Sequence, residues 1–243
     1  MIWWRRLTGR FFIDRRIEDQ RWVVLDVESS GLDPRNDRLL AIAGVAVCFR
    51  RGEPRVEIAD SFEVTLHQED AADPAAHAAA AVLPPAGRAV GAVDEVDRPN
   101  ILLHGIGVGA QRAGVPPAQA LESFLEWVGG SPLLAYHAAF DRTLIHRYCQ
   151  AHVGRRPTNQ WLDLEHLVSL LVPGLPDRTL DSAMAGLGVG CLRRHQAAAD
   201  TLATADLLLR LWPLAKAQMK GRSDFRSLAK LAARHRWLRG QEG

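Results

Sequence analysis

The stretch WVVLDVESSG, residues 22–31, joins a compact apolar run to two acids and a turn. The run up to Val27 is rich in β-branched residues and predicts a strand. Successive side chains of a strand point to opposite faces, so Asp26 and Glu28 share one face and Val27 points to the other. Two neighbouring anions are unfavourable unless a cation lies between them. The pair therefore fits a divalent-metal site, and taken alone it equally fits a solvated strand end.

Two further apolar runs follow this strand, at residues 39–49 and 56–66. Turn residues such as Ser, Gly, Asp, Pro and Asn separate the runs, which is typical of adjacent strands. A three-stranded meander therefore opens the predicted fold.

The second half of the chain changes to helical spacing. A short buried strand is expected at 133–136, between the first two of these helical segments. The predicted helices cover residues 116–128, 140–152, 163–171, 179–187 and 196–218. A meander followed by helix-linked strands predicts an α/β fold, in which helices flank a mixed β-sheet.

The length of 243 residues and the 47% hydrophobic content allow one sizeable core. We expect one domain at residues 22–218, between a basic, aromatic extension at 1–21 and a basic tail at 219–243. Residues 68–100 are rich in Ala, are interrupted by Pro and contain no aromatic residue, so they predict a loop insertion. The tail is expected to form a helix that packs on the domain; a helix that contacts nucleic acid or a partner is the alternative.

Composition argues against several kinds of protein, although the net charge is not informative. The formal charge of +2 does not by itself indicate a nucleic-acid partner. The cysteines lack metal-type spacing, which argues against a zinc site or a disulfide framework. Arginines interrupt the N-terminal aromatic residues, so no signal peptide is predicted, and no stretch approaches the ~20 apolar residues that span a bilayer. We expect a cytoplasmic protein without a membrane partner.

Three more polar residues occupy positions where site residues gather. Asp141 follows the short strand, and strand ends collect ligand-binding groups in open α/β sheets; it also fits a helix N-cap. His195 and Asp200 are five residues apart, a rotation of ~140° along a helix, so they would not share a helix face. They converge if His195 belongs to the loop or the first turn. Taken alone, each of these two also fits an ordinary surface residue.

The runs LDVESSG, AYHAAFD and HQAAAD occur in this order within residues 22–212. They resemble the three signature segments of the DEDDh 3′–5′ exonucleases, the family of the polymerase III epsilon subunit and RNase T. The resemblance implies an RNase H-like fold and phosphodiester hydrolysis with two divalent cations, Mg²⁺ or Mn²⁺, about 4 Å apart. His195 would accept the proton of the attacking water. The implied metal ligands are Asp26, Glu28, Asp141 and Asp200.

The same resemblance implies how a nucleotide is held. The segment after the first motif handles the terminal nucleotide in this family, so the backbone near Ser29 and Ser30 would meet the 3′ hydroxyl. Leu32 would wedge against the last base; a partly buried turn leucine is the alternative. His104 begins an HGI segment that would line the substrate groove, or else belongs to an ordinary loop turn. Ala41 departs from the family pattern, because epsilon-type members often carry Glu there.

The expected function is a 3′–5′ exonuclease that removes nucleoside 5′-monophosphates from the single-stranded or frayed 3′ end of DNA, in proofreading or repair. A DNA polymerase or repair protein is the expected partner. RNA 3′-end trimming is an alternative, because both activities use the same metal centre. A non-catalytic nucleic-acid-binding or polymerase-associated scaffold subunit is the alternative from a different class. Retention of all the implied site residues argues against the scaffold.

Overall fold

The computed structural model describes residues 21–68 and 105–235. The N-terminal extension up to residue 20, nearly all of the expected insertion, His104 and the end of the basic tail lie outside the described residues. Within the described part, no helix is long and apolar enough to cross a membrane.

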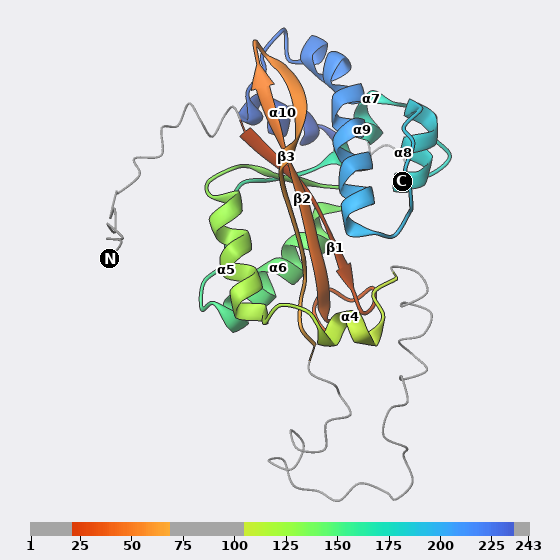
Figure 1. The fold of residues 1–243 in the computed structure, drawn as a ribbon. Coiled ribbons are helices and arrows are strands. Elements are labelled where there is room, and N and C mark those ends of the chain that lie inside the picture. Colours follow the sequence, from red (N-terminus) through yellow and green to blue (C-terminus); the bar gives the residue numbers. More distant parts are fainter. Residues whose placement is uncertain (1–20, 69–104, 236–243) are drawn as a thin grey trace, which may run out of the picture.

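A mixed five-stranded sheet in the order β3-β2-β1-β4-β5 forms the centre of the fold (Figure 1). The predicted meander is confirmed as β1 (Arg21–Ser29), β2 (Leu39–Arg50) and β3 (Glu53–Thr65), all antiparallel. β4 (Leu133–Ala135) lies parallel to β1, and β5 (Trp161–Asp163) lies parallel to β4. The α/β class is therefore confirmed. The sequence pattern did not predict β5, because Trp161–Asp163 lacks the purely apolar run that indicated β4.

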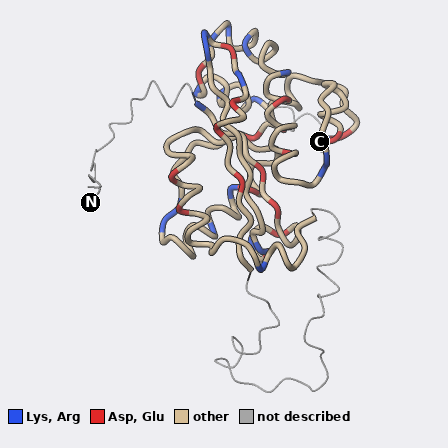
Figure 2. Tube along the Cα trace, in the orientation of Figure 1, with Lys and Arg blue, Asp and Glu red and all other residues tan. Residues whose placement is uncertain are grey.

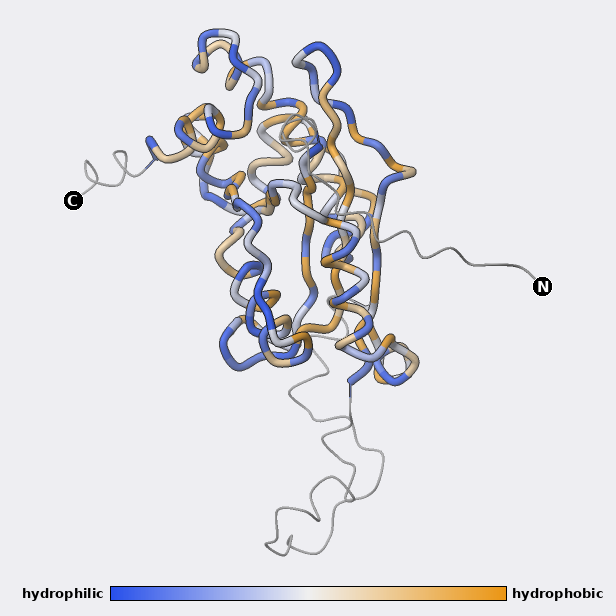
Figure 3. Tube along the Cα trace, turned by 90° about the vertical axis from the view of Figure 1, so that its left-hand side faces the viewer, coloured by the Kyte–Doolittle hydropathy of each residue, from blue (hydrophilic) through white to orange (hydrophobic). Residues whose placement is uncertain are grey.

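Helices cover both faces of the sheet. One apolar core lies between the sheet and two helices, α5 (Pro117–Val128) and α6 (Ala138–His152). The other core lies against α7 (Leu164–Leu171), α8 (Leu180–Leu187), α9 (Ala197–Gln218) and α10 (Phe225–Ala232). The short α4 (Val108–Arg112) precedes α5. Figure 3 shows hydrophobic residues gathered along the strands, inside these layers.

Alternate side chains of β1 belong to two different cores, one on each face of the sheet. Trp22 and Val24 belong to the core with α9, whereas Val27 belongs to the core with α5 and α6. The alternation therefore directs Asp26 and Glu28 towards the α9 side, and it confirms the prediction that they share the face opposite to Val27. In the register with β2, Ala43 lies opposite Asp26 and Ala41 lies opposite Glu28.

The helix expected in the basic tail is α10, and it packs on the domain. Phe225, Leu228 and Leu231 are buried in the core that contains α9. Asp224 caps the helix by accepting a hydrogen bond of 2.8 Å from the backbone amide of Ser227. The apolar face of this helix is thus used for packing within the domain.

Candidate active site

Three carboxylates meet where the end of β1 approaches the first turn of α9 (Figure 1). One oxygen from each of Asp26, Glu28 and Asp200 can be chosen so that all three lie within 4.8 Å of one another. Figure 2 shows acidic residues on the central strands in this part of the fold. The structure therefore brings together residues from the first and third sequence motifs.

Asp141 joins this cluster from the first turn of α6. Parallel pairing of β4 with β1 brings the start of α6 to the end of β1, where the Val27 backbone hydrogen-bonds to the buried Asp141 carboxyl. Asp141 lies close enough to Asp26 for its negative charge to raise the pKa of Asp26. The N-cap of α6 is His137, so the alternative interpretation of Asp141 as the N-cap is wrong.

The electrostatics of the cluster disfavour its full ionisation. Burial is the main cause that raises the pKa of Glu28 to about 7 and the pKa of Asp141 to about 8. Burial, followed by repulsion from Asp141, Glu28 and Asp200, raises the pKa of Asp26 well above its ordinary value. Solvent partly reaches Asp26, but protein surrounds the carboxyl closely enough for burial to dominate. A set of hard carboxylate oxygens that repel one another fits hard divalent cations.

His195 lies in the loop before α9, as its convergence with Asp200 requires. Its backbone φ is 60°, in the left-handed region, and α9 begins only at Ala197. The backbone amide of His195 donates a hydrogen bond of 3.0 Å to Oδ2 of Asp200. The histidine is partly exposed. The backbone of His195 is thus held next to Asp200, one of the clustered acids.

Arg194 is a site residue that the sequence patterns do not reveal. Its Nε donates a hydrogen bond of 2.5 Å to Oδ1 of Asp181, and its Nη1 forms an ion pair with Oδ1 of Asp200. Its position directly before His195 was the one available signal. A permanent positive charge therefore lies at the edge of the acidic cluster.

The loop after β1 is held largely by its own hydrogen bonds. The Ser29 hydroxyl donates to the carbonyl of Gly31 at 2.6 Å, and the Ser30 hydroxyl accepts from the amide of Arg38 at 2.8 Å. The Leu32 side chain extends from this loop and is 93% exposed. The alternative interpretation of Leu32 as a partly buried turn residue is therefore wrong.

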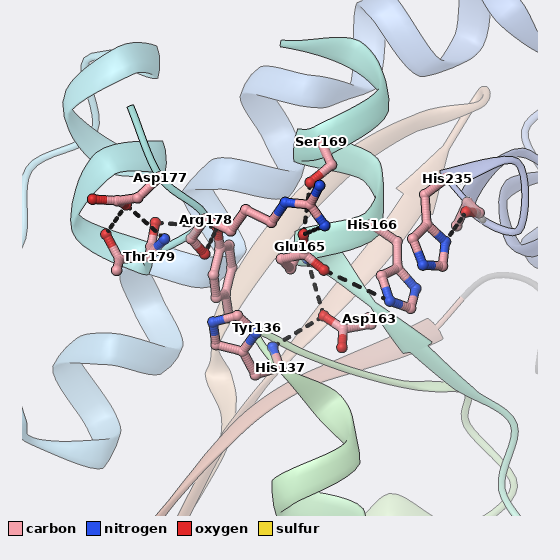
Figure 4. Close-up of polar contacts among 11 residues, drawn as sticks. Tyr136, His137, Asp163, Glu165, His166, Ser169, Asp177, Arg178, Thr179 and His235 are labelled. Atoms are coloured by element: carbon pink, nitrogen blue, oxygen red, sulfur yellow. Dashed lines mark hydrogen bonds and ion pairs between the residues drawn. The ribbon is translucent and has the colours of Figure 1, made fainter. Parts of the chain in front are cut away.

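A second polar cluster adjoins the start of α6 (Figure 4). Oδ1 of Asp163 accepts hydrogen bonds of 3.0 Å from the backbone amides of both His137 and Glu165. Asp163 thereby connects the start of α6 to the start of α7, and its charge contributes to the raised pKa of Asp141. Its position on the edge strand β5 explains why the sequence patterns did not point to it.

Sequence comparisons find similar proteins. The exonuclease family model matches residues 94–208. The DNA polymerase III PolC-type proteins of Clostridium perfringens and Bacillus subtilis are each 27% identical to this chain, over 192 and 200 residues. These matches support the resemblance to the DEDDh-type 3′–5′ exonucleases that the sequence motifs indicate. The two alignments cover 78% and 81% of this chain, but only 11% and 12% of the length of the polymerases.

Solved structures agree on the fold of this chain. Exonuclease I from E. coli in complex with a dT13 oligonucleotide has a TM-score of 0.60 and 19% sequence identity, covering 86% of this chain and 45% of that one. Exonuclease I from Methylocaldum szegediense has a TM-score of 0.57 and 20% identity, covering 82% and 43% of the two chains. The expected RNase H-like arrangement is therefore confirmed.

Proposed function

We propose that this protein is a metal-dependent 3′–5′ exonuclease that shortens DNA from a single-stranded or frayed 3′ end. The proposal rests chiefly on the convergence of the carboxylates of Asp26, Glu28 and Asp200 within 4.8 Å, with Asp141 beside them. DNA is favoured as the substrate because the relatives are called DNA polymerases, and one structural neighbour was solved with a DNA oligonucleotide. Proofreading or repair, with a DNA polymerase or repair protein as partner, is the setting that we propose.

The four carboxylates supply only oxygen ligands, which hard cations prefer. Two divalent cations, Mg²⁺ or Mn²⁺, held by these side chains would supply an activated water and stabilise the leaving 3′ oxygen. The cation ligands in this proposal are Asp26, Glu28, Asp141 and Asp200.

His195 is the proposed acceptor of the proton from the attacking water. An imidazole titrates near neutral pH and suits this task. The water oxygen forms a bond to phosphorus, the bond from phosphorus to the 3′ oxygen breaks, and that oxygen leaves on the shortened strand. The released product is a nucleoside 5′-monophosphate. The hydrogen bond from His195 to Asp200 keeps the histidine next to the carboxylates.

The loop after β1 is the proposed contact for the terminal nucleotide. The backbone near Ser29 and Ser30 would meet the 3′ hydroxyl, since their hydroxyl groups already serve the loop itself. The exposed Leu32 side chain would pack against the last base, because covering an exposed leucine removes apolar surface from water. Contact with a free 3′ end would explain exonucleolytic rather than internal cleavage.

A 5′-labelled single-stranded oligodeoxynucleotide tests this function. We expect stepwise shortening from the 3′ end with Mg²⁺ or Mn²⁺, release of nucleoside 5′-monophosphates, and no reaction with chelator. An oligonucleotide with a 3′ phosphate is the substrate control, and Asp26→Asn is the enzyme control. Cleavage in chelator, or no cleavage with either metal, would contradict the proposal. Faster turnover of an RNA of the same sequence would reassign the substrate to RNA.

A further inference from the structure

We propose that Arg194 is a built-in counter-cation that neutralises Asp200 in the metal-free site and competes with divalent cations for it. In this role Arg194 lowers the affinity of the site for metal and stabilises the metal-free protein. The inference rests on the proposed function, because it concerns the cations that the clustered acids would hold.

The two acidic neighbours of Arg194 differ in character. Asp181, in the first turn of α8, is 63% exposed and accepts a directed hydrogen bond of 2.5 Å from Nε. The Asp200 side chain is only 7% exposed and forms an ion pair with Nη1. This nitrogen is shielded from solvent, and within the described ranges it has no partner with hydrogen-bond geometry. Arg194 therefore pairs at the same time with one exposed carboxylate and one buried carboxylate.

Both oxygens of Asp200 are occupied in this arrangement. Oδ2 accepts the amide of His195, while Oδ1 contacts Arg194 and lies 3.5 Å from Sγ of Cys191. A divalent cation bound at Oδ1 would therefore meet the positive charge of Arg194 at close range. Like charges at that separation repel strongly inside a protein. Metal binding at this oxygen consequently requires Nη1 to withdraw.

Asp181 makes this withdrawal feasible. Removing one partner of a buried ion pair is costly when the other charge is left without compensation. Arg194 keeps its hydrogen bond to Asp181 when it leaves Asp200, so its charge stays paired near the surface. The two acids thus form an inner and an outer anchor for one guanidinium.

The charge of Arg194 also reaches the other acids. Burial is the main cause of the raised pKa of both Asp26 and Glu28, and repulsion from neighbouring carboxylates adds to it. The positive charge of Arg194 opposes both effects by lowering these pKa values. The arginine therefore offsets part of the repulsion that a divalent cation would otherwise remove.

The decisive measurement is calorimetric titration of the metal-free protein with Mn²⁺, without substrate. We expect Arg194→Gln to bind Mn²⁺ about tenfold more tightly than the wild type, a change of ~1.4 kcal/mol. The same variant should melt at a lower temperature in chelator, because Asp200 loses its counter-charge. Arg210→Gln is the matched control, since Arg210 lies on α9 and pairs with Asp206 at the surface; it should leave Mn²⁺ affinity unchanged.

Asp181→Asn gives the opposite prediction and does not remove the arginine. Without Asp181, displacement from Asp200 leaves the guanidinium uncompensated, so Mn²⁺ should bind more weakly than to the wild type. Equal or weaker Mn²⁺ binding by Arg194→Gln would overturn the inference, as would unchanged or tighter binding by Asp181→Asn. Failure of the wild type to bind Mn²⁺ would instead overturn the proposed metal centre, so the two failures are distinguishable.

Discussion

The backbone amide of His195 donates a hydrogen bond of 3.0 Å to Oδ2 of Asp200, across the junction between a loop and α9. The left-handed backbone of His195, with φ of 60°, turns the chain so that this amide faces the carboxylate. Residues five apart in a regular helix would diverge. This junction therefore explains how the proposed proton acceptor and a proposed metal ligand occupy one site.

Replacement of His195 should separate its chemical role from its backbone role. Both His195→Asn and His195→Ala are expected to lower kcat on single-stranded DNA by about 10² to 10⁴-fold, the usual range for general acid–base assistance. Asn tolerates a left-handed backbone better than Ala does, so His195→Asn should have the higher melting temperature. Steady-state kinetics and thermal unfolding check the two expectations. A His195→Asn enzyme with the wild-type rate would exclude the proton-transfer role.

Neutralising Asp26 should abolish turnover and stabilise the metal-free protein. Burial and three neighbouring carboxylates disfavour the ionised form of Asp26, and Asp26→Asn removes that charge. We expect a higher melting temperature than the wild type in chelator at pH 8, with no exonuclease activity in Mg²⁺. Asp206→Asn, at a partly exposed position on α9, is the control and should change neither property. Destabilisation of Asp26→Asn in chelator would argue against repulsion in the cluster.

The stability of the metal-free protein should fall as the pH rises. Folding raises the pKa of Glu28 from 4.5 to about 7 and the pKa of Asp141 from 3.8 to about 8. A raised carboxyl pKa contributes stability that is complete below the unfolded value and is lost as the pH passes the folded value. Denaturant unfolding in chelator should therefore give a free energy that decreases between about pH 5 and pH 9.

Saturating Mg²⁺ should reduce this decrease, because a bound cation stabilises the ionised carboxylates. The melting temperature increase caused by Mg²⁺ should accordingly be larger at pH 8 than at pH 6. Glu28→Gln in chelator serves as the control and should show a shallower pH dependence than the wild type. A flat or rising stability profile for the metal-free wild type would contradict the raised pKa values.

Truncation of Leu32 should weaken substrate use without affecting the fold. Leu32 is 93% exposed, so Leu32→Ser removes no packing within the protein. We expect kcat/KM on single-stranded DNA to fall about tenfold, which lies within the gain from burying part of a leucine side chain. Ile58→Ser, on β3 and 61% exposed, is the matched control. Equal kinetic effects of the two substitutions would remove Leu32 from the proposed nucleotide contact.

Local patterns in the sequence were sufficient to predict the strands in the first half of the fold and the shared face of one pair of acids. The β-branched apolar run at residues 22–27 predicted β1. The shared face of Asp26 and Glu28 followed from it, because strand geometry alone makes side chains alternate between faces. Helical spacing likewise predicted α5 and α9 to within one residue at their ends. The short elements α4 and β5 were not predicted, because their residues are too few to show a helical period and do not form a purely apolar run like that of β4.

By itself, then, the amino-acid sequence determined the α/β class, the resemblance to a nuclease family and the local setting of the first two acids. Only the tertiary structure decided which distant groups meet them. Parallel pairing of β4 with β1 brings Asp141 to the backbone of Val27, and the left-handed turn at His195 directs its amide to Asp200. The pairing of Arg194 with both Asp181 and Asp200 depends on how α8 and α9 pack. Strand order and helix packing depend on contacts between residues far apart in the sequence, so local sequence patterns do not predict them.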